Sequence, residues 1–292
     1  MVLFAKGFIM GASDVVPGVS GGTMALILGI YEKLILSIKM FDSRLLRLVL
    51  RGRFKQAAST IPFGFLLPLG FGILTAIFTM ARGLGWLLEN YPSAIWSFFF
   101  GLVLASAMVV ARRIDKWDWK TAASFLMATA GAYVLVGMVP LNTPQTIPYI
   151  FMCGAIAICA MILPGISGSF ILVLLGKYKY ILDAVATFDL SVLFVFTIGT
   201  ISGIMIFVRL LSWLLRHYYR ITMAALTGLM IGSLRKIWPW KSIAAPNTDG
   251  SVGDVVFVNI LPQEVDGHLF LAIALAIIGG LMVVFLQRLA EK

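Results

Sequence analysis

The chain consists mainly of long apolar runs that short polar segments separate. Residues 61–81 and 272–286 contain no acidic or basic side chain, and about 20 helical residues are enough to cross a bilayer. The pattern therefore predicts an all-α polytopic membrane protein. Complete apolar spans are expected at about 60–82, 93–111, 120–140, 190–211, 219–234 and 268–287.

Two further apolar segments are each interrupted by a Pro-Gly break. The first break reads PGVSGG from Pro17, and the second reads PGISGS from Pro164. An offset of 147 residues aligns the two prolines, and the same offset aligns Gly29 with Gly176. Two matched interruptions half a chain apart indicate an internal duplication.

A second repeated signature supports the duplication. An Arg-x3-Trp-Leu-Leu segment begins at Arg82 and again at Arg209, an offset of 127 residues. The first half therefore carries 20 extra residues, which we assign to the basic segment 39–59. The predicted repeat units are 1–140 and 148–288, each a broken segment followed by three spans.

The broken segments, 3–38 and 148–186, have two possible paths through the bilayer. Arms of residues 3–16 and 23–38 would each extend about 20–25 Å, which is short of the roughly 30 Å hydrocarbon core. The arms form either a re-entrant hairpin, which inverts the two halves, or one broken span, which leaves them parallel. Charge counting does not separate these arrangements, but a single helix over 3–38 would be about 54 Å long, so length favours hairpins.

Composition agrees with a membrane location. The chain is 60% hydrophobic and 12% charged, with a net charge of +10. Because the Lys and Arg residues gather in short loops between spans, we read the charge as an orientation signal and expect no nucleic-acid partner. With hairpins, both termini and the loops 39–59, 112–120 and 212–220 are cytoplasmic, whereas 141–147 and 235–267 are external.

The second arm of each break begins with small residues at the expected middle of the membrane. Free N–H groups and the positive dipole end of a half-helix bind oxyanions, and glycines permit their close approach. Alternatively, the small residues only allow helices to pack closely. Matched breaks favour a substrate site. The candidate substrate-binding residues at the breaks are Pro17, Gly18, Ser20, Gly21, Gly22, Thr23, Gly165, Ser167, Gly168 and Ser169.

Three charged residues at predicted membrane depth complete the candidate site. Arg82 and Arg209 each precede by four residues a Trp that marks the interface. A guanidinium binds phosphate oxygens in pairs, although an Arg near the end of a span can also extend to the interface as an anchor. Asp14, whose counterpart is Met161, is a coupling candidate. It can pair with an arginine, carry a proton, hold a cation or cap the Gly-rich turn.

The segment KGFIMGASDVVPGVSGGTMALILGIYEKLI resembles the opening signature of the bacterial polyprenyl-phosphate transporter family, and the resemblance continues through ILPGISGSFILVLLGKY to cover essentially the whole chain. It implies inverted repeats with paired re-entrant hairpins. The implied function is translocation of undecaprenyl phosphate from the outer to the inner leaflet of the bacterial cytoplasmic membrane. The implied partners are the lipid and the bilayer, a homodimer is one possible assembly, and no cofactor or metal is expected.

The residues alone leave two other classes open. A small-anion transporter would use the same breaks. Its site would open only to water, whereas the site of a lipid translocase would open sideways to lipid. An intramembrane lipid phosphatase is less compatible, because the sequence has no HExxH, no GxSxG and no acidic cluster suited to metal-assisted hydrolysis. The two breaks also need not bind equally, since Gly22 of the first is matched by Ser169 of the second.

Overall fold

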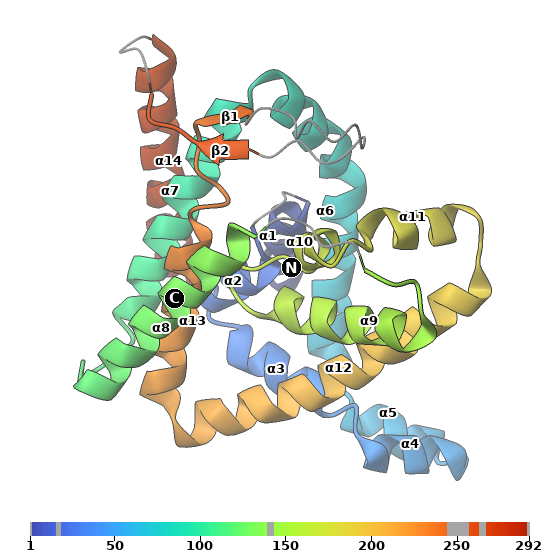
Figure 1. Cartoon of the computed structure of the whole chain (residues 1–292). Coiled ribbons are helices and arrows are strands. Elements are labelled where there is room, and N and C mark those ends of the chain that lie inside the picture. The colour runs from blue at the N-terminus through green and yellow to red at the C-terminus, as the bar shows by residue number, and fades with distance from the viewer. Residues whose placement is uncertain (1, 16–18, 139–142, 244–256, 263–266, 291–292) are drawn as a thin grey trace.

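A computed structural model describes residues 2–15, 19–138, 143–243, 257–262 and 267–290, which form fourteen helices and one two-stranded sheet (Figure 1). The first half contains α1 (Val2–Asp14), α2 (Gly21–Ile27), α3 (Tyr31–Lys39), α4 (Ser43–Leu50), α5 (Phe54–Thr60), α6 (Phe63–Asn90), α7 (Pro92–Ala111) and α8 (Trp119–Val136). The second contains α9 (Ile147–Ile162), α10 (Gly168–Leu174), α11 (Tyr178–Ala186), α12 (Leu190–His217), α13 (Tyr219–Ser233), the antiparallel strands β1 (Lys241–Ile243) and β2 (Phe257–Asn259), and α14 (Gly267–Ala290).

The prediction of an all-α polytopic membrane protein is confirmed. Within the described residues, four helices are long and apolar enough to cross a membrane: α6, α7, α12 and α14. Shorter helices, α8 and α13, occupy the spans predicted at 120–140 and 219–234. The predicted basic loop 39–59 is partly helical, since it contains α4 and most of α5.

Each broken segment contains three helices rather than two arms. The axes of α2 and α3 differ in direction by 118°, and a corresponding break separates α10 from α11. Gly29 and Gly176 lie at these second breaks with φ values of +69° and +63°. The residue after each glycine donates its N–H to the carbonyl five residues earlier, which is the Schellman ending of a helix. The prediction of one continuous arm over 23–38 is therefore wrong, because Gly29 ends the first helix of that arm.

The duplicated sequence builds the same helix pair twice. Helix α1 packs on α6, and α9 packs on α12. A Cβ atom on Gly72 would collide with the α1 backbone at Phe4, and one on Gly199 would collide with the α9 backbone at Phe151. Phe4 and Phe151 are 147 residues apart, whereas Gly72 and Gly199 are 127 apart. The glycines thus permit the close helix contacts that stabilise membrane bundles.

The last helix of each half packs on the other half. Helix α14 contacts α7, where Gly101 lies against Ala276, and α8 contacts α13, where Gly228 lies against Phe125. The two glycines are again 127 residues apart. In Figure 1, α7 and α14 accordingly lie side by side, as do α8 and α13. The two halves are therefore intertwined through these exchanged helices.

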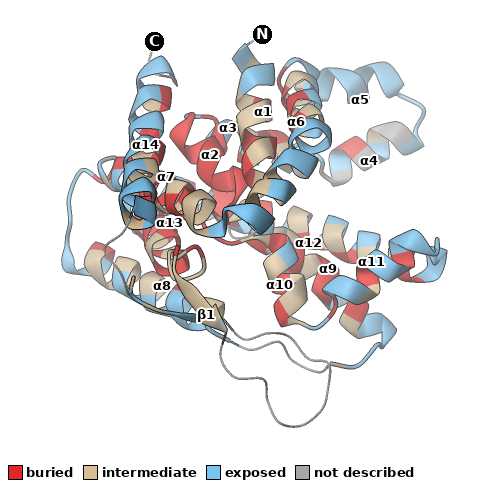
Figure 2. Cartoon of the chain, turned by 90° about the horizontal axis from the view of Figure 1, so that it is seen from above, coloured by how far each residue is buried: buried red, intermediate tan, exposed pale blue. Residues whose placement is uncertain are grey.

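Helix α2 lies at the centre of the molecule. All seven of its residues are buried, and Figure 2 shows it in red, surrounded by helices with exposed outer faces. Its neighbours include α1, α7 and α9, so both halves enclose it. The fold therefore buries the start of the second arm of the first break.

Candidate functional site

The first break contacts the second at the middle of the molecule. The Ser20 hydroxyl lies 3.2 Å from the carbonyl oxygen of Met161 and 3.3 Å from that of Leu163, at the end of α9. Gly22 lies so close to α9 that a Cβ atom there would be 2.6 Å from the Ile162 carbonyl oxygen. Segments about 140 residues apart in sequence therefore form one continuous structure.

Two further hydrogen bonds join the breaks. The Gly165 N–H donates to the Thr23 hydroxyl at 3.1 Å, and the Tyr31 hydroxyl donates to the Ile162 carbonyl at 3.2 Å. Thr23 and Gly165 belong to the predicted site, whereas the contact of Tyr31 was not predicted. The predicted residues Pro17 and Gly18 lie outside the described residues.

At the first break, the protein's own side chains accept from the backbone donors. The Gly21 N–H donates to the Asp14 carboxylate at 2.6 Å, and the Gly22 N–H donates to the Ser20 hydroxyl at 3.1 Å. Ser20 and Thr23 are buried. Of the roles considered for Asp14, the one visible in this conformation is capping of α2, because an anion at a helix N-terminus satisfies its free N–H groups.

The second break is more open. The Ser167 and Ser169 hydroxyl oxygens lie 2.7 Å apart, and Ser169 is exposed. Ser167 precedes α10 but makes no side-chain capping bond to it. The residue that corresponds to Asp14 is Met161, which has no carboxylate. Predicted residues of this break thus present hydroxyl groups that another molecule can reach.

A lysine that the sequence analysis did not single out lies beside the second break. Gly165 packs against the end of α13, where an added Cβ would be 2.8 Å from the Ser233 hydroxyl oxygen. The chain leaves α13 there, and the Lys236 Nζ lies 4.4 Å from the ring centroid of Phe170, the neighbour of Ser169. Burial lowers the pKa of Lys236 below its ordinary value.

Sequence comparison between the halves did not identify Lys236. At the 127-residue offset its counterpart is Val109, so no repeated motif marks it. The available signal was the local sequence Arg-Lys-Ile-Trp-Pro-Trp-Lys from Arg235 to Lys241, in which basic residues flank two interface-type aromatic residues.

Arg82 lies near the level of the first break but points outward. Helices α1 and α6 run in the same direction, because Gly7 packs on Leu69 and Gly11 packs on Ile73. This register places Arg82 roughly 6–9 Å beyond the level at which α1 ends. Its side chain is exposed.

Arg209 lies beside the basic segment rather than at the second break. Its side chain is exposed on α12. The pKa of the Asp42 carboxyl is lowered first by the N–H of Leu45, and the charge of Arg209 is a smaller contributor. Within the described residues, no hydrogen bond or ion pair joins Arg82 or Arg209 to a break.

Polar side chains donate hydrogen bonds to carbonyl groups at the C-terminal ends of the short helices α2 and α10. Lys6 donates to the Leu28 carbonyl at 2.9 Å, and Thr143 donates to the Leu175 carbonyl at 2.6 Å. The buried Lys177 donates in turn to the Thr143 carbonyl at 2.8 Å. Cations stabilise the negative end of a helix, so we assign Lys6 and Lys177 a structural role.

Sequence comparisons agree on one family. Residues 10–254 match a family described as VCA0040-like, undecaprenyl phosphate translocase-like. A polyprenyl-phosphate transporter from Vibrio cholerae serotype O1 is 42% identical over 304 aligned positions, which cover 99% of this chain and 96% of that protein.

A more distant relative has the same name. A polyprenyl-phosphate transporter from Staphylococcus aureus is 32% identical over 253 positions, which cover 80% of this chain and 84% of that protein. No solved structure gives a significant match. The name of each relative describes a transporter rather than an enzyme.

Proposed function

Because this chain belongs to the family of undecaprenyl phosphate translocase-like proteins, we propose that it carries a polyprenyl phosphate across the membrane. In its finer form, the proposal is that the protein returns undecaprenyl phosphate from the outer to the inner leaflet of the bacterial cytoplasmic membrane. The observation that carries the proposal is the contact between two polar breaks inside an apolar helical bundle.

The second break is the proposed binding site for the phosphate. A lipid phosphate that enters hydrocarbon loses its hydration, and this costs free energy unless other donors replace the water. Ser167 and Ser169 offer hydroxyl groups, Gly168 between them packs closely on α9, and Lys236 supplies a positive charge nearby. Charge-assisted hydrogen bonds of this type are about twice as strong as neutral ones.

The first break is the proposed second binding position of the phosphate during transport. In this conformation Asp14 occupies the Gly21 N–H that a phosphate oxygen would otherwise accept from. Departure of Asp14 would free the Gly21 N–H, and separation of Ser20 and Thr23 from the second break would make the rest of the cradle, namely Gly22, Ser20 and Thr23 together with Pro17 and Gly18, available to the headgroup. Because a proton on Asp14 would weaken its bond to Gly21, Asp14 is the candidate for coupling transport to protons.

The arginines belong to the outer parts of the proposed path. With inverted halves, Arg82 would meet the headgroup at the external face and Arg209 at the cytoplasmic face. Both termini would then be cytoplasmic. The exposed side chains of Arg82 and Arg209 suit brief contact with the headgroup at a membrane surface better than sustained binding at the centre of the protein.

Transport in proteoliposomes tests this function. Purified protein should accelerate the movement of undecaprenyl phosphate between leaflets, without release of free phosphate and without uptake of inorganic phosphate into the vesicles. Movement equal to that in protein-free vesicles would contradict the proposal. Release of phosphate would identify a phosphatase instead, and uptake of inorganic phosphate would identify a small-anion carrier.

A further inference from the structure

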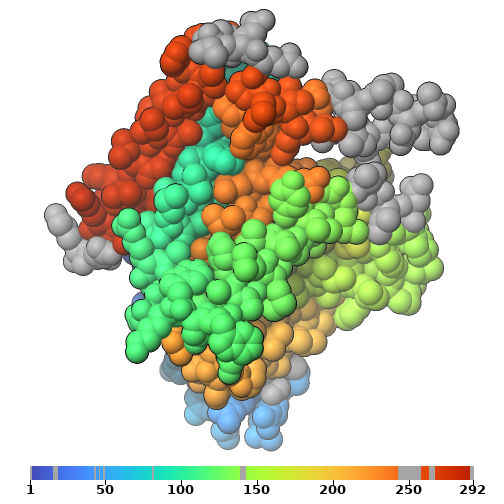
Figure 3. Space-filling view, turned by 60° about the vertical axis from the view of Figure 1, so that its left-hand side comes forward, coloured from blue at the N-terminus to red at the C-terminus, as the bar shows by residue number. Residues whose placement is uncertain are grey.

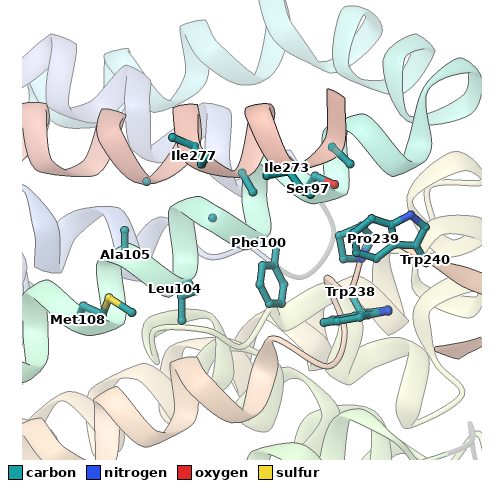
Figure 4. Close-up of a pocket in the computed structure, with 14 residues that line it drawn as sticks. Ser97, Phe100, Leu104, Ala105, Met108, Trp238, Pro239, Trp240, Ile273 and Ile277 are labelled. Carbon is teal, nitrogen blue, oxygen red and sulfur yellow. The ribbon is translucent and has the colours of Figure 1, made fainter. Parts of the chain in front are cut away.

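An apolar groove lies between α7 and α14, outside the two breaks. Its volume is about 390 Å³. Figure 3 shows α14 and α7 side by side on the surface, with orange residues that follow α13 at their upper end. Figure 4 shows the lining, which includes Phe100, Leu104 and Met108 of α7, Ile273 and Ile277 of α14, and Trp238.

The groove lies between two candidate membrane spans, and its walls are held in place. Both α7 and α14 are apolar enough to span the bilayer. Trp238 donates its indole N–H to the Ile260 carbonyl at 2.8 Å and packs edge-on against Phe100, with the ring centroids 5.5 Å apart. A preformed apolar wall of this kind suits a hydrocarbon chain.

Two lysines lie at one end of the groove. The Lys241 Nζ is 4.5 Å from the ring centroid of Trp96, which is adjacent to the groove residue Ser97. The same ammonium donates to the Lys236 carbonyl. Lys236 itself lies against Phe170 of the second break, so the pair connects the groove with that break.

The positive charge at this end has no described acidic partner. Burial and, to a smaller extent, the neighbouring charge of Lys236 lower the pKa of Lys241 to about 8. Among the residues that the structure describes, one ion pair is present, between Arg220 and Asp118. Two half-buried ammonium groups repel each other, and an anion placed between them would relieve this repulsion.

We propose that the groove binds the part of the isoprenoid chain next to the phosphate, while Lys241 binds the phosphate itself. This inference rests on the proposed function, because it supposes that the substrate is a lipid monophosphate. An apolar groove with a cationic end matches an amphiphile that has one anionic group and a long apolar chain. The lipid would enter sideways from the bilayer, and its headgroup would then pass from Lys241 to Lys236 and the second break.

A variant that fills the groove tests the inference. We expect Leu104→Trp to raise the undecaprenyl phosphate concentration for half-maximal transport about ten-fold, with the maximal rate unchanged. Lys241→Gln should raise it by a similar factor. The matched control is Leu74→Trp, at an exposed apolar position of α6, which should leave the concentration dependence as in the wild type. Wild-type concentration dependence in Leu104→Trp would overturn the inference.

A second measurement does not depend on the folding of a variant. Polyprenyl phosphate that carries a photoreactive group on an isoprene unit near the phosphate should label α7 or α14 of the wild-type protein. Unlabelled polyprenyl phosphate should prevent this labelling, and an equal amount of phosphatidylglycerol should not. Labelling confined to other helices, or equal competition by both lipids, would overturn the groove site. If the wild type binds the probe at the groove but moves no lipid, only the transport proposal fails.

Discussion

The two breaks share a sequence pattern but differ in what satisfies their polar groups. At the first break, Asp14 and Ser20 accept the N–H groups of Gly21 and Gly22, and residues 19–23 are buried. At the second break, Met161 replaces the carboxylate, and the Ser169 hydroxyl is exposed. A duplicated motif has thus become an internally capped core element in one half and an accessible polar turn in the other.

Under the proposed function, this difference would let one motif serve packing in one half and binding in the other. The buried break contributes Ser20, Thr23 and Tyr31 to the hydrogen bonds that hold the halves together. Buried polar groups with such partners contribute to a unique core, and their loss is costly. The open break leaves the Ser169 hydroxyl exposed, and our proposal assigns this break, with Lys236 beside it, to phosphate binding.

The largest effect is expected from a change in packing at the first break. Gly22→Ala would place a methyl group 2.6 Å from the Ile162 carbonyl oxygen, and we expect it to destabilise the protein by about 3 kcal/mol, since overpacking costs roughly that much. Thermal unfolding in detergent measures this. Gly70→Ala is the matched control, because its Cβ meets no atom within 4 Å. An unchanged unfolding temperature for Gly22→Ala would refute the tight contact between the breaks.

Serine substitutions distinguish the two breaks directly. The double variant Ser167→Ala/Ser169→Ala should lower transport at least about 100-fold, since each hydrogen bond to a charged group contributes about 1.5–3 kcal/mol. Its unfolding temperature should stay at the wild-type value. Ser20→Ala should instead lower the free energy of unfolding by about 1–2 kcal/mol, because it leaves buried groups without a partner. If both variants changed transport and stability in the same way, the proposed functional difference between the breaks would be contradicted.

Asp14→Asn tests whether the first break is coupled to protons. The amide oxygen can still accept from Gly21, so the fold should be retained. If protonation of Asp14 frees the Gly21 N–H, wild-type transport rises as the pH falls, and the uncharged variant loses this dependence. Initial transport rates of the wild type and of Asp14→Asn at several pH values test this prediction. An identical pH profile in both proteins would leave Asp14 as a cap alone.

The smallest effect is expected at the exposed arginines. Arg82→Lys and Arg209→Lys keep the charge but lose the planar fork, so a transient contact with phosphate should weaken and transport should fall about three-fold. Leaflet-resolved rates for the two variants measure this. Wild-type rates in both would identify Arg82 and Arg209 as membrane anchors.

Repetition in the sequence predicted the parts of the structure that depend on local chemistry. The Pro-Gly motifs at Pro17 and Pro164 predicted two breaks, and the spacing of Gly72 and Gly199 reflects packing that occurs in both halves. Gly29 and Gly176 were matched as a pair, but their role in ending a helix was missed, because helix-ending glycines resemble packing glycines in an apolar run.

Features that depend on tertiary contacts were not predicted. The exchange of α8 and α14 between the halves follows from contacts such as Gly101 with Ala276, which no spacing reveals. Lys236 was not predicted because its counterpart in the first half is Val109, so no repeated motif marks it. The capping bond of Asp14 was one of several roles considered, and its distance to Gly21 identified the one present in this conformation.

Protection of the second break by substrate is the most direct test of the account. In a Cys153→Ala/Cys159→Ala background, Ser169→Cys provides one thiol at an exposed position, and a water-soluble thiol reagent reports its accessibility. We predict that undecaprenyl phosphate slows the modification about ten-fold, as occupancy of the site by a ligand at ten times its dissociation constant would, whereas the corresponding polyprenol has no effect. An unchanged modification rate at saturating undecaprenyl phosphate would contradict the assignment of the second break as the phosphate site.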